Sequence, residues 1–249
     1  MKLPTTCPVS GVQITTQGRV TQVTVQNTAT GEISTFDCDY CISTMPVRDL
    51  IDSLETEVPD DVKNVANGLV YRDFKTVGLL LDKVKIEMPD NWVYIQERDV
   101  KVGRLQVFNN WSPYMVSDSS KVWIGLEYFC NEGDELWTMP DQEFIEFAKD
   151  ELEKIDIIDK KDVLDAVVIA MPKAYPAYFG TYDKIHVIKN FVDKIENLYL
   201  IGRNGMHRYN NMDHSMLSAM QAVNNIINNI TTKNNIWNVN AEEAYQEEK

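Results

Sequence analysis

The 249-residue sequence has few cysteines and few histidines. Its four cysteines, Cys7, Cys38, Cys41 and Cys130, are too few and too scattered for a disulfide framework. Cys38 and Cys41 have the spacing of a metal or redox pair, but no second pair exists and no histidine lies near them. Cys41 opens an apolar run, so we interpret it as a buried structural residue. The three histidines form no HExxH motif, and we therefore predict no metal site.

The sequence also lacks a long apolar run and an excess of positive charge. No stretch approaches the roughly 20 apolar residues of a membrane helix, and the first residues do not resemble a signal peptide. We therefore expect a cytoplasmic protein without a membrane partner. The 24 basic and 38 acidic side chains give a net charge of -14, which argues against nucleic acid. A phosphorylated substrate would need a local arginine cluster.

The glycines do not form a dinucleotide-binding fingerprint. None of the eleven glycines belongs to a G-x-G-x-x-G motif. Gly202 and Gly205 are close to each other, but they do not follow this fingerprint. The sequence as given therefore lacks the strand, turn and helix that hold the pyrophosphate of such a cofactor.

The hydrophobic content of 44% supports a sizeable core, and the residue pattern predicts an α+β fold. In the first third we expect a hairpin of strands 20–26 and 33–37, a strand at 40–44, a helix over 47–54 with Pro46 in its first turn, and a short helix from Pro59. Strands at 76–81, 92–96, 104–108 and 122–129 are spaced like an antiparallel meander. An amphipathic helix should cover 141–155.

In the last third of the sequence we expect a strand at 167–171, a proline- and tyrosine-rich loop, a helix over 182–195 and a strand at 198–202. A helix from Asp213, with that aspartate as its cap, should run to about residue 230. Its apolar side chains recur at helical spacing: Met216, Ala219, Met220, Val223, Ile226 and Ile227. The acidic tail either docks through Trp237 and Tyr245 or frays.

The densest polar segment of the sequence runs from Gly202 to Asp213. It places two arginines, a histidine, a tyrosine and several asparagines between a strand and a helix. Backbone N–H groups at such a helix terminus suit an anion or an electron-rich cofactor edge. From the residues alone, a binding site and a polar connecting loop are equally good interpretations.

The order and spacing of several motifs resemble a known family of flavoproteins. Gly202-Arg203-Asn204-Gly205 leading to Arg208-Tyr209, followed by Met212-Asp213-His214-Ser215-Met216, is similar to the C-terminal flavin-contacting segment of UDP-galactopyranose mutases and their amine-oxidase-like relatives. Ile42 to Pro46, Trp92 to Tyr94, Arg104 to Tyr114, and Ala174 to Pro176 resemble further segments in the same order. The resemblance covers nearly all of residues 12–246.

The resemblance implies substrate and cofactor residues. Arg104 and Arg203 would hold a substrate diphosphate through paired, charge-assisted hydrogen bonds. The hydroxyl groups that would assist them belong to Tyr94, Tyr175 and Tyr209. The residues that would contact the flavin are Gly202, Asn211, Met212, Asp213 and Ser215. A salt bridge on an edge strand is the competing interpretation of Arg104, taken alone. The resemblance assigns no catalytic side chain, because in the mutases reduced flavin itself attacks the anomeric carbon.

His207 departs from the mutase pattern, in which an aromatic residue occupies this place. It could act as an acid or base, and an exposed loop histidine is the alternative. The loop between Tyr209 and Asp213 is also slightly shorter than in the eukaryotic mutases. Both differences bear on the identity of the substrate more than on the flavin.

The resemblance also implies how the chain is divided. Residues 1–46 would be a hairpin and strand of a split, Rossmann-like FAD-binding domain. Residues 47–196 would form a mainly antiparallel substrate-binding sheet with covering helices, residues 197–230 a return strand and flavin-contacting helix, and residues 231–249 a tail. The missing partner would be the N-terminal FAD-binding half, without which we expect weak or no FAD binding and no activity.

Three functions remain open on the sequence. The first is an FAD-dependent, UDP-galactopyranose mutase-like enzyme acting on a nucleotide sugar. The second is an amine-oxidase- or desaturase-like FAD oxidoreductase with a carbon substrate. The third is a non-catalytic fragment or interaction module that pairs through exposed sheet edges.

Overall fold

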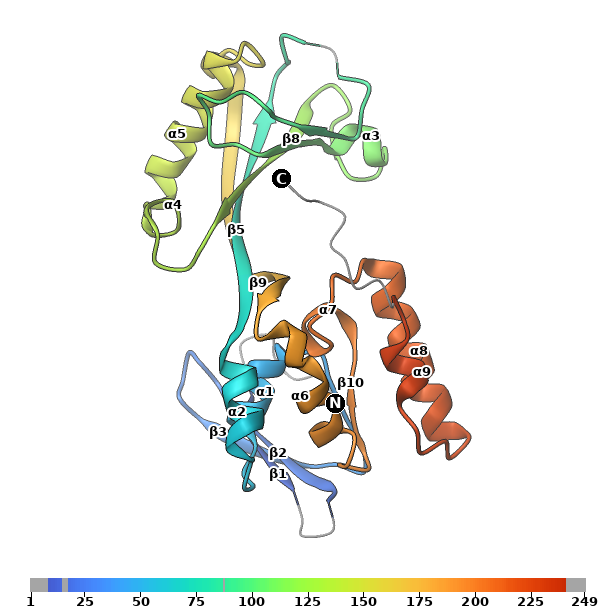
Figure 1. Cartoon of the computed structure of the whole chain (residues 1–249). Helices are drawn as coiled ribbons and strands as arrows, with labels where there is room; N and C mark the ends of the chain where they lie inside the picture. The colour runs from blue at the N-terminus through green and yellow to red at the C-terminus, as the bar shows by residue number, and fades with distance from the viewer. Residues whose placement is uncertain (1–8, 15–17, 87, 241–249) are drawn as a thin grey trace. The chain divides into compact units, whose positions relative to one another are not determined.

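A computed structural model describes residues 9–14, 18–86 and 88–240 (Figure 1). Cys7 and Tyr245, which the sequence analysis considered, lie outside this range. No helix within the described part is long and apolar enough to cross a membrane. The chain forms two compact units, one from residues 1–71 and 175–249 and one from residues 72–174. We call them unit 1 and unit 2.

Unit 1 contains a three-stranded antiparallel sheet and a two-stranded parallel sheet. The first is formed by β1 (Val9–Ile14), β2 (Val20–Gln26) and β3 (Ile33–Asp37), and the second by β4 (Cys41–Ser43) and β10 (Leu198–Leu200). The predicted hairpin of β2 and β3 is confirmed. The helices are α1 (Val47–Ser53), α2 (Asp60–Asn67), α6 (Ile185–Val192), α7 (Gly202–Gly205), α8 (Met212–Ile227) and α9 (Asn234–Trp237).

Unit 2 is built on most of a five-stranded sheet. Its strands are β6 (Trp92–Tyr94), β7 (Arg104–Val107), β8 (Val122–Cys130), β5 (Leu69–Leu81) and β9 (Val163–Gly180), in that spatial order. The short helices α3 (Phe108–Trp111) and α4 (Glu135–Thr138) and the long α5 (Asp141–Lys154) complete the unit. Strands β5 and β9 each contribute residues to both units.

The core of unit 2 lies between α5 and one face of the sheet. Val77 and Leu79 of β5, Leu126 of β8, and Phe144 and Leu152 of α5 are completely buried in it. The alternation of side chains along each strand directs these residues to the helix and their neighbours to the opposite face. The fold class is therefore α+β with a mainly antiparallel sheet, as predicted.

The strand order differs from the predicted meander. β6, β7 and β8 follow one another in space, but β5 is not the neighbour of β6 that a meander requires. Instead Asp73–Leu81 of β5 pair with Val122–Cys130 of β8, so that β5 lies between β8 and β9. This long register buries the apolar side chains of both strands on the α5 side. Packing of whole strand faces, which chain order does not reveal, determines the neighbours.

The predicted proline-rich loop after residue 171 is wrong. β9 continues from Val163 to Gly180 through Pro172 and Pro176. β9 lies at the edge of its sheet, where a proline need not supply a ladder N–H group. The helix predicted at 182–195 is shorter, because a 3-10 turn at Tyr182–Lys184 precedes α6. Pro46 is the N-cap of α1, and Asn211, in place of the predicted Asp213, is the N-cap of α8.

The two compact units divide the chain at different positions from the functional segments given above. Helices α1 and α2, which fell in the predicted 47–196 segment, pack in the core of unit 1 with Leu198 and Leu200. The functional segmentation itself stays a prediction.

Asn197 connects the two sheets of unit 1. Its side-chain oxygen accepts from the Val20 N–H group, and its amide donates to the carbonyls of Val20 and Asp39, at 2.7 to 2.8 Å. Only 1% of this residue is exposed. Its loss would therefore leave buried backbone groups without their hydrogen-bond partner, at about 1–3 kcal/mol for each group.

We expect Asn197→Ala to lower the free energy of unfolding by about 2–4 kcal/mol, measured by urea denaturation. Asn190→Ala, at an exposed position on α6, is the control and should change it by less than about 0.5 kcal/mol. Equal effects of the two substitutions would contradict the role given to Asn197.

Candidate functional site

The loop after β10 brings three of the predicted substrate residues together. The guanidinium carbon of Arg203 lies 4.7 Å from the ring centre of Tyr209 and 5.2 Å from that of Tyr175. The two tyrosine rings are stacked, with their centres 5.4 Å apart. Arg203 Nε also donates to the carbonyl of Asn210 at 2.8 Å. We call Arg203, Tyr175 and Tyr209 the Arg203 cluster; all three are half-buried in unit 1.

The glycines of α7 position this loop against β4. Gly202 has a φ of 74°, which an L-residue adopts only under strain, and its N–H group donates to Ser218 Oγ at 3.0 Å. A Cβ atom at Gly205 would approach the carbonyl oxygen of Ser43 to 2.7 Å. The sequence singled out both glycines, and the structure shows a positive φ at Gly202 and a close approach of the backbone at Gly205.

His207 holds the loop to the end of β9. It is completely buried, and its Nε2 lies 3.1 Å from the carbonyl oxygen of Ala177. Its ring packs edge-on against Tyr71, with 4.7 Å between ring centres, and near Tyr182. Desolvation lowers the pKa of His207 to about 4, against a smaller opposing effect of the Ala177 carbonyl. The exposed loop histidine considered above is therefore wrong, and His207 is neutral near pH 7.

Two further residues in this region were not found from the sequence. The hydroxyl of Tyr178 accepts from the Tyr209 N–H group at 2.8 Å. Asn240 donates to the Tyr209 carbonyl and to Asn210 Oδ1, both at 3.0 Å. A sequence signal existed for Tyr178, because it belongs to a tyrosine-rich segment. Asn240 gives none.

Arg104 and Tyr94 lie in unit 2, on the sheet face opposite α5. Tyr94, Arg104 and Glu127 are direct cross-strand partners on β6, β7 and β8. The guanidinium carbon lies 4.8 to 5.2 Å from the ring centres of Trp92, Tyr94 and Phe129. Trp92 and Tyr94 are stacked and 39% and 54% exposed, whereas Arg104 is 2% exposed.

Glu127 is the charged partner of Arg104. Its Oε2 lies 3.5 Å from Arg104 Nη1, and its Oε1 accepts from the amide of Gln106. Arg104 thus makes a salt bridge, but a buried one on an interior strand. The roles of Arg104 and Tyr94 toward a substrate stay predictions. Sequence alone did not find Glu127, because its contact with Arg104 depends on strand register.

The predicted flavin-contacting residues lie at the beginning of α8. Asn211, Met212 and Asp213 are exposed, and Met212 is exposed to 81%. Asn211 is in an extended conformation and makes no side-chain capping hydrogen bond. The first turn of α8 thus presents N–H groups that favour an electron-rich partner. Gly202 and Ser215 are nearby, since Ser218 of the same helix binds the Gly202 N–H group.

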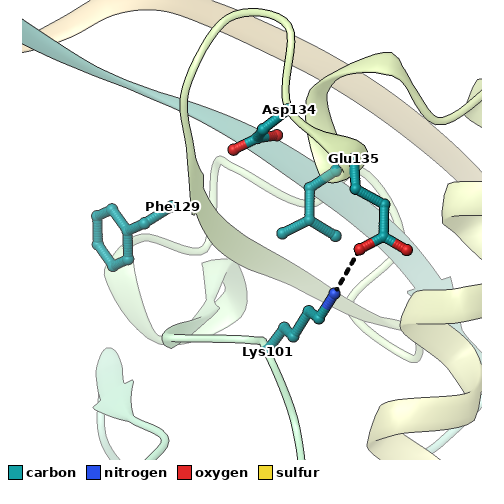
Figure 2. A pocket seen from close by; sticks show the side chains of 5 residues that line it. Lys101, Phe129, Asp134 and Glu135 are labelled. Atoms are coloured by element: carbon teal, nitrogen blue, oxygen red, sulfur yellow. Dashed lines mark hydrogen bonds and ion pairs between the residues drawn. The ribbon is translucent and has the colours of Figure 1, made fainter.

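Other chemical sites are weaker. Desolvation raises the pKa of Cys41 to about 11, which agrees with a structural thiol, and the described residues contain no cluster of metal-ligating side chains. Figure 2 shows a cavity of about 390 Å³ in unit 2, lined by Lys101, Phe129, Asp134, Glu135 and Leu136. There Lys101 Nζ lies 3.1 Å from Glu135, and the cavity contains none of the predicted site residues.

Comparison with solved structures identifies the fold. A crystal structure of reduced UDP-galactopyranose mutase matches with a TM-score of 0.72 and 18% identity, over 94% of this chain and 49% of that one. A putative protoporphyrinogen oxidase from Exiguobacterium sp. 255-15 matches with a TM-score of 0.52 and 15% identity, over 80% and 42% of the two chains. An oxidoreductase from Methanosarcina mazei matches with a TM-score of 0.50 and 14% identity, over 80% and 44%.

These matches confirm the resemblance at the level of the fold. The chain spans about half the length of the solved structures that it matches. No family model and no curated protein matches the sequence.

The buried neutral state of His207 predicts a pH dependence of stability. The unfolded histidine, with a pKa near 6.5, binds protons more readily than the folded one, with a pKa of about 4. The contribution of neutral His207 to the free energy of unfolding is therefore complete above pH 6.5 and is lost as the pH falls toward 4. We expect a slope of up to about 1.4 kcal/mol per pH unit in urea denaturation across this window.

His207→Gln should remove this part of the slope, while His186→Gln, at an exposed position on α6, should retain it. An unchanged slope in His207→Gln would show that other groups cause the pH dependence.

The Arg104 ion pair predicts a second effect on stability. Arg104→Met leaves the buried Glu127 without its charged partner, and we expect a loss of about 3–5 kcal/mol, measured by urea denaturation. The double variant Arg104→Met/Glu127→Gln should recover much of it, because no uncompensated charge remains. Arg98→Met, at an exposed position, is the control. A loss of less than about 1 kcal/mol in Arg104→Met would contradict the ion pair.

Proposed function

We propose that the chain supplies about half of an FAD-dependent enzyme that resembles UDP-galactopyranose mutase and acts on a nucleotide sugar. The Arg203 cluster carries this proposal. It places Arg203, in the segment that follows β10, beside the stacked rings of Tyr175 and Tyr209. The preference for a mutase over an oxidase is supported by the higher TM-score of the mutase structure, 0.72 against 0.52 and 0.50.

The Arg203 cluster suits a diphosphate. A guanidinium group donates paired hydrogen bonds to phosphate oxygens and stays charged at any physiological pH. The contacts with the two stacked tyrosine rings and the hydrogen bond to the Asn210 carbonyl fix its orientation before a ligand binds. Such preorganisation lowers the entropic cost of binding. The hydroxyl groups of Tyr175 and Tyr209 would add neutral hydrogen-bond donors.

In unit 2, Arg104 and Tyr94 are further candidates for contact with a substrate. The aromatic side chains Trp92 and Tyr94 are exposed beside the buried guanidinium and offer flat surfaces to a ring of the substrate. A phosphate at Arg104 would compete with Glu127 for the guanidinium. We therefore propose Arg203 as the phosphate-binding arginine.

FAD fits the residues at the beginning of α8. The exposed first turn of this helix leaves backbone N–H groups accessible to a flat, electron-rich ring. Bound flavin would supply the redox or nucleophilic chemistry, and the side chains of this chain would orient the substrate and neutralise its charge. Because the sequence contains no G-x-G-x-x-G motif, a further polypeptide segment would bind the FAD pyrophosphate.

Binding of UDP tests this function directly. We expect the chain to bind UDP more tightly than uridine in isothermal titration calorimetry. Arg203→Met should weaken UDP binding by about 10- to 100-fold, because a charge-assisted pair of hydrogen bonds is lost. Its effect on uridine, which has no phosphate, should be small.

Arg19→Met is the matched control, since Arg19 is an arginine of the same unit that pairs with Glu196 at the surface. Equal binding of UDP by Arg203→Met and Arg19→Met would contradict the proposed diphosphate site.

A further inference from the structure

Tyr209 is held by side chains at both of its backbone polar groups. Its N–H group donates to the hydroxyl oxygen of Tyr178 at 2.8 Å, and its carbonyl oxygen accepts from the Asn240 amide at 3.0 Å. Each of these partners lies 31 residues from Tyr209 in the sequence. Most backbone groups that are bonded within a protein pair with other backbone groups. The orientation of Tyr209 is therefore set by side chains from two distant segments.

The hydroxyl of Tyr178 has a defined position because its ring is packed. The ring is stacked on Tyr182, with 4.4 Å between the ring centres and 9° between the planes. Tyr182 also lies near His207, whose Nε2 is 3.1 Å from the carbonyl oxygen of Ala177, the residue before Tyr178. A ring that is already fixed by stacking loses little further freedom when its hydroxyl binds.

Asn240 is bound to the same loop by three hydrogen bonds. In addition to its bond with Tyr209, its amide donates to Asn210 Oδ1 at 3.0 Å, and its carbonyl oxygen accepts from Arg208 Nη1 at 2.7 Å. Asn240 has a φ of 51°, a left-handed conformation that asparagine tolerates better than most residues. The segment after α9 is thus fixed against the loop in both directions, as donor and as acceptor.

The contacts of Tyr209 continue to Arg203. The Tyr209 ring lies 4.7 Å from the guanidinium carbon, and the carbonyl of the next residue, Asn210, accepts from Arg203 Nε at 2.8 Å. A rotation of the backbone at Tyr209 would move the ring and this carbonyl together. The direction of the guanidinium therefore depends on the two side chains that hold the Tyr209 backbone.

We propose that Tyr178 and Asn240 are positioning residues, which hold Tyr209 and through it aim the Arg203 guanidinium at the phosphate. We call the two residues the Tyr209 clamp. This inference rests on the proposed function, because it concerns the same site. A guanidinium that is fixed in advance loses less conformational entropy when the phosphate binds, and the clamp supplies that fixation without contacting the ligand.

Tyr178→Phe tests the first half of the clamp. It removes one hydroxyl group and keeps the ring that stacks on Tyr182. The NMR resonance of the Arg203 Nε–H group, assigned by its loss in Arg203→Met, reports the orientation of the guanidinium without a ligand, because nearby aromatic rings displace it. We expect this resonance to move toward that of a solvent-exposed arginine.

Tyr40→Phe, which removes an exposed hydroxyl group in the same unit, is the control and should leave the Arg203 resonance unchanged. An unmoved Arg203 resonance in Tyr178→Phe would overturn the role of Tyr178.

Asn240→Gly tests the second half of the clamp. Glycine adopts a φ of 51° without strain, so the substitution removes the amide and preserves the backbone. We expect it to displace the Arg203 resonance as well. Asn229→Gly is the matched control, because Asn229 is an exposed asparagine with a φ of 53°. Identical spectra of the two glycine variants at Arg203 would contradict the role of Asn240.

Binding of UDP measures the consequence for the site. In isothermal titration calorimetry, Tyr178→Phe and Asn240→Gly should each weaken UDP binding by about 3- to 10-fold, as expected for loss of a hydrogen bond, and change uridine binding by less than about twofold. Equal weakening of UDP and uridine would indicate a general disturbance of the fold and would overturn the proposal.

A double-mutant cycle separates positioning from direct contact. Because the clamp acts through Arg203, Tyr178→Phe should have no further effect on UDP binding in the Arg203→Met background. An additional loss there as large as in the wild-type background would show that Tyr178 acts on the ligand by another route.

The two proposals can fail separately. If Tyr178→Phe moves the Arg203 resonance but Arg203→Met leaves UDP binding unchanged, the diphosphate site is wrong and the clamp still orients Arg203. If UDP binding requires Arg203 but neither clamp variant moves its resonance, the clamp is wrong and the diphosphate site stands.

Discussion

The loop from Gly202 to Asn210 is held within unit 1 by two buried polar side chains, those of His207 and Asn210. His207 is completely buried against Tyr71 and bonds the Ala177 carbonyl, while Asn210 is 1% exposed and donates to the Gly202 carbonyl. A buried polar group without a partner costs free energy that a small domain cannot spare. The loop is therefore fixed at its centre and its end, and Arg203 and Tyr209 take their positions from these anchors.

In unit 2, the register of the strands fixes the position of Arg104. Tyr94, Arg104, Glu127 and Thr76 form one row across four strands, and Trp92, Gln106, Gly125 and Gly78 form the next. A shift of one residue in the β7–β8 pair would move Arg104 into the apolar core against α5. The glycines of the second row make room for neighbouring rings, since a Cβ atom at Gly125 would meet Phe108 at 2.8 Å. One sheet thus presents an apolar face to α5 and an arginine with aromatic side chains on the other.

The sequence predicted local structure well and contacts between distant strands poorly. The β2–β3 hairpin, α5 and the strand before Gly202 follow from alternation, helical spacing and turn residues. The continuation of β9 through Pro172 was missed, because only its edge position makes proline acceptable there. Glu127 was missed because its contact with Arg104 requires the β7–β8 register, and burial of His207 because it requires Tyr71, which is distant in the chain. Arg203, Tyr175 and Tyr209 were assigned by resemblance, and their grouping is a structural finding.

The electrostatics of the two arginines limit how an acidic protein can bind a diphosphate. With a net charge of -14, the chain repels anions at long range, so binding depends on short contacts with a desolvated cation. Arg104 is desolvated, but Glu127 neutralises it at 3.5 Å. Arg203 contacts two tyrosine rings and a backbone carbonyl, groups that orient a guanidinium without adding a negative charge. Under the proposed function, an incoming phosphate would therefore gain more from Arg203 than from Arg104, and the Arg104–Glu127 pair would suit a neutral ring lying against Trp92 and Tyr94.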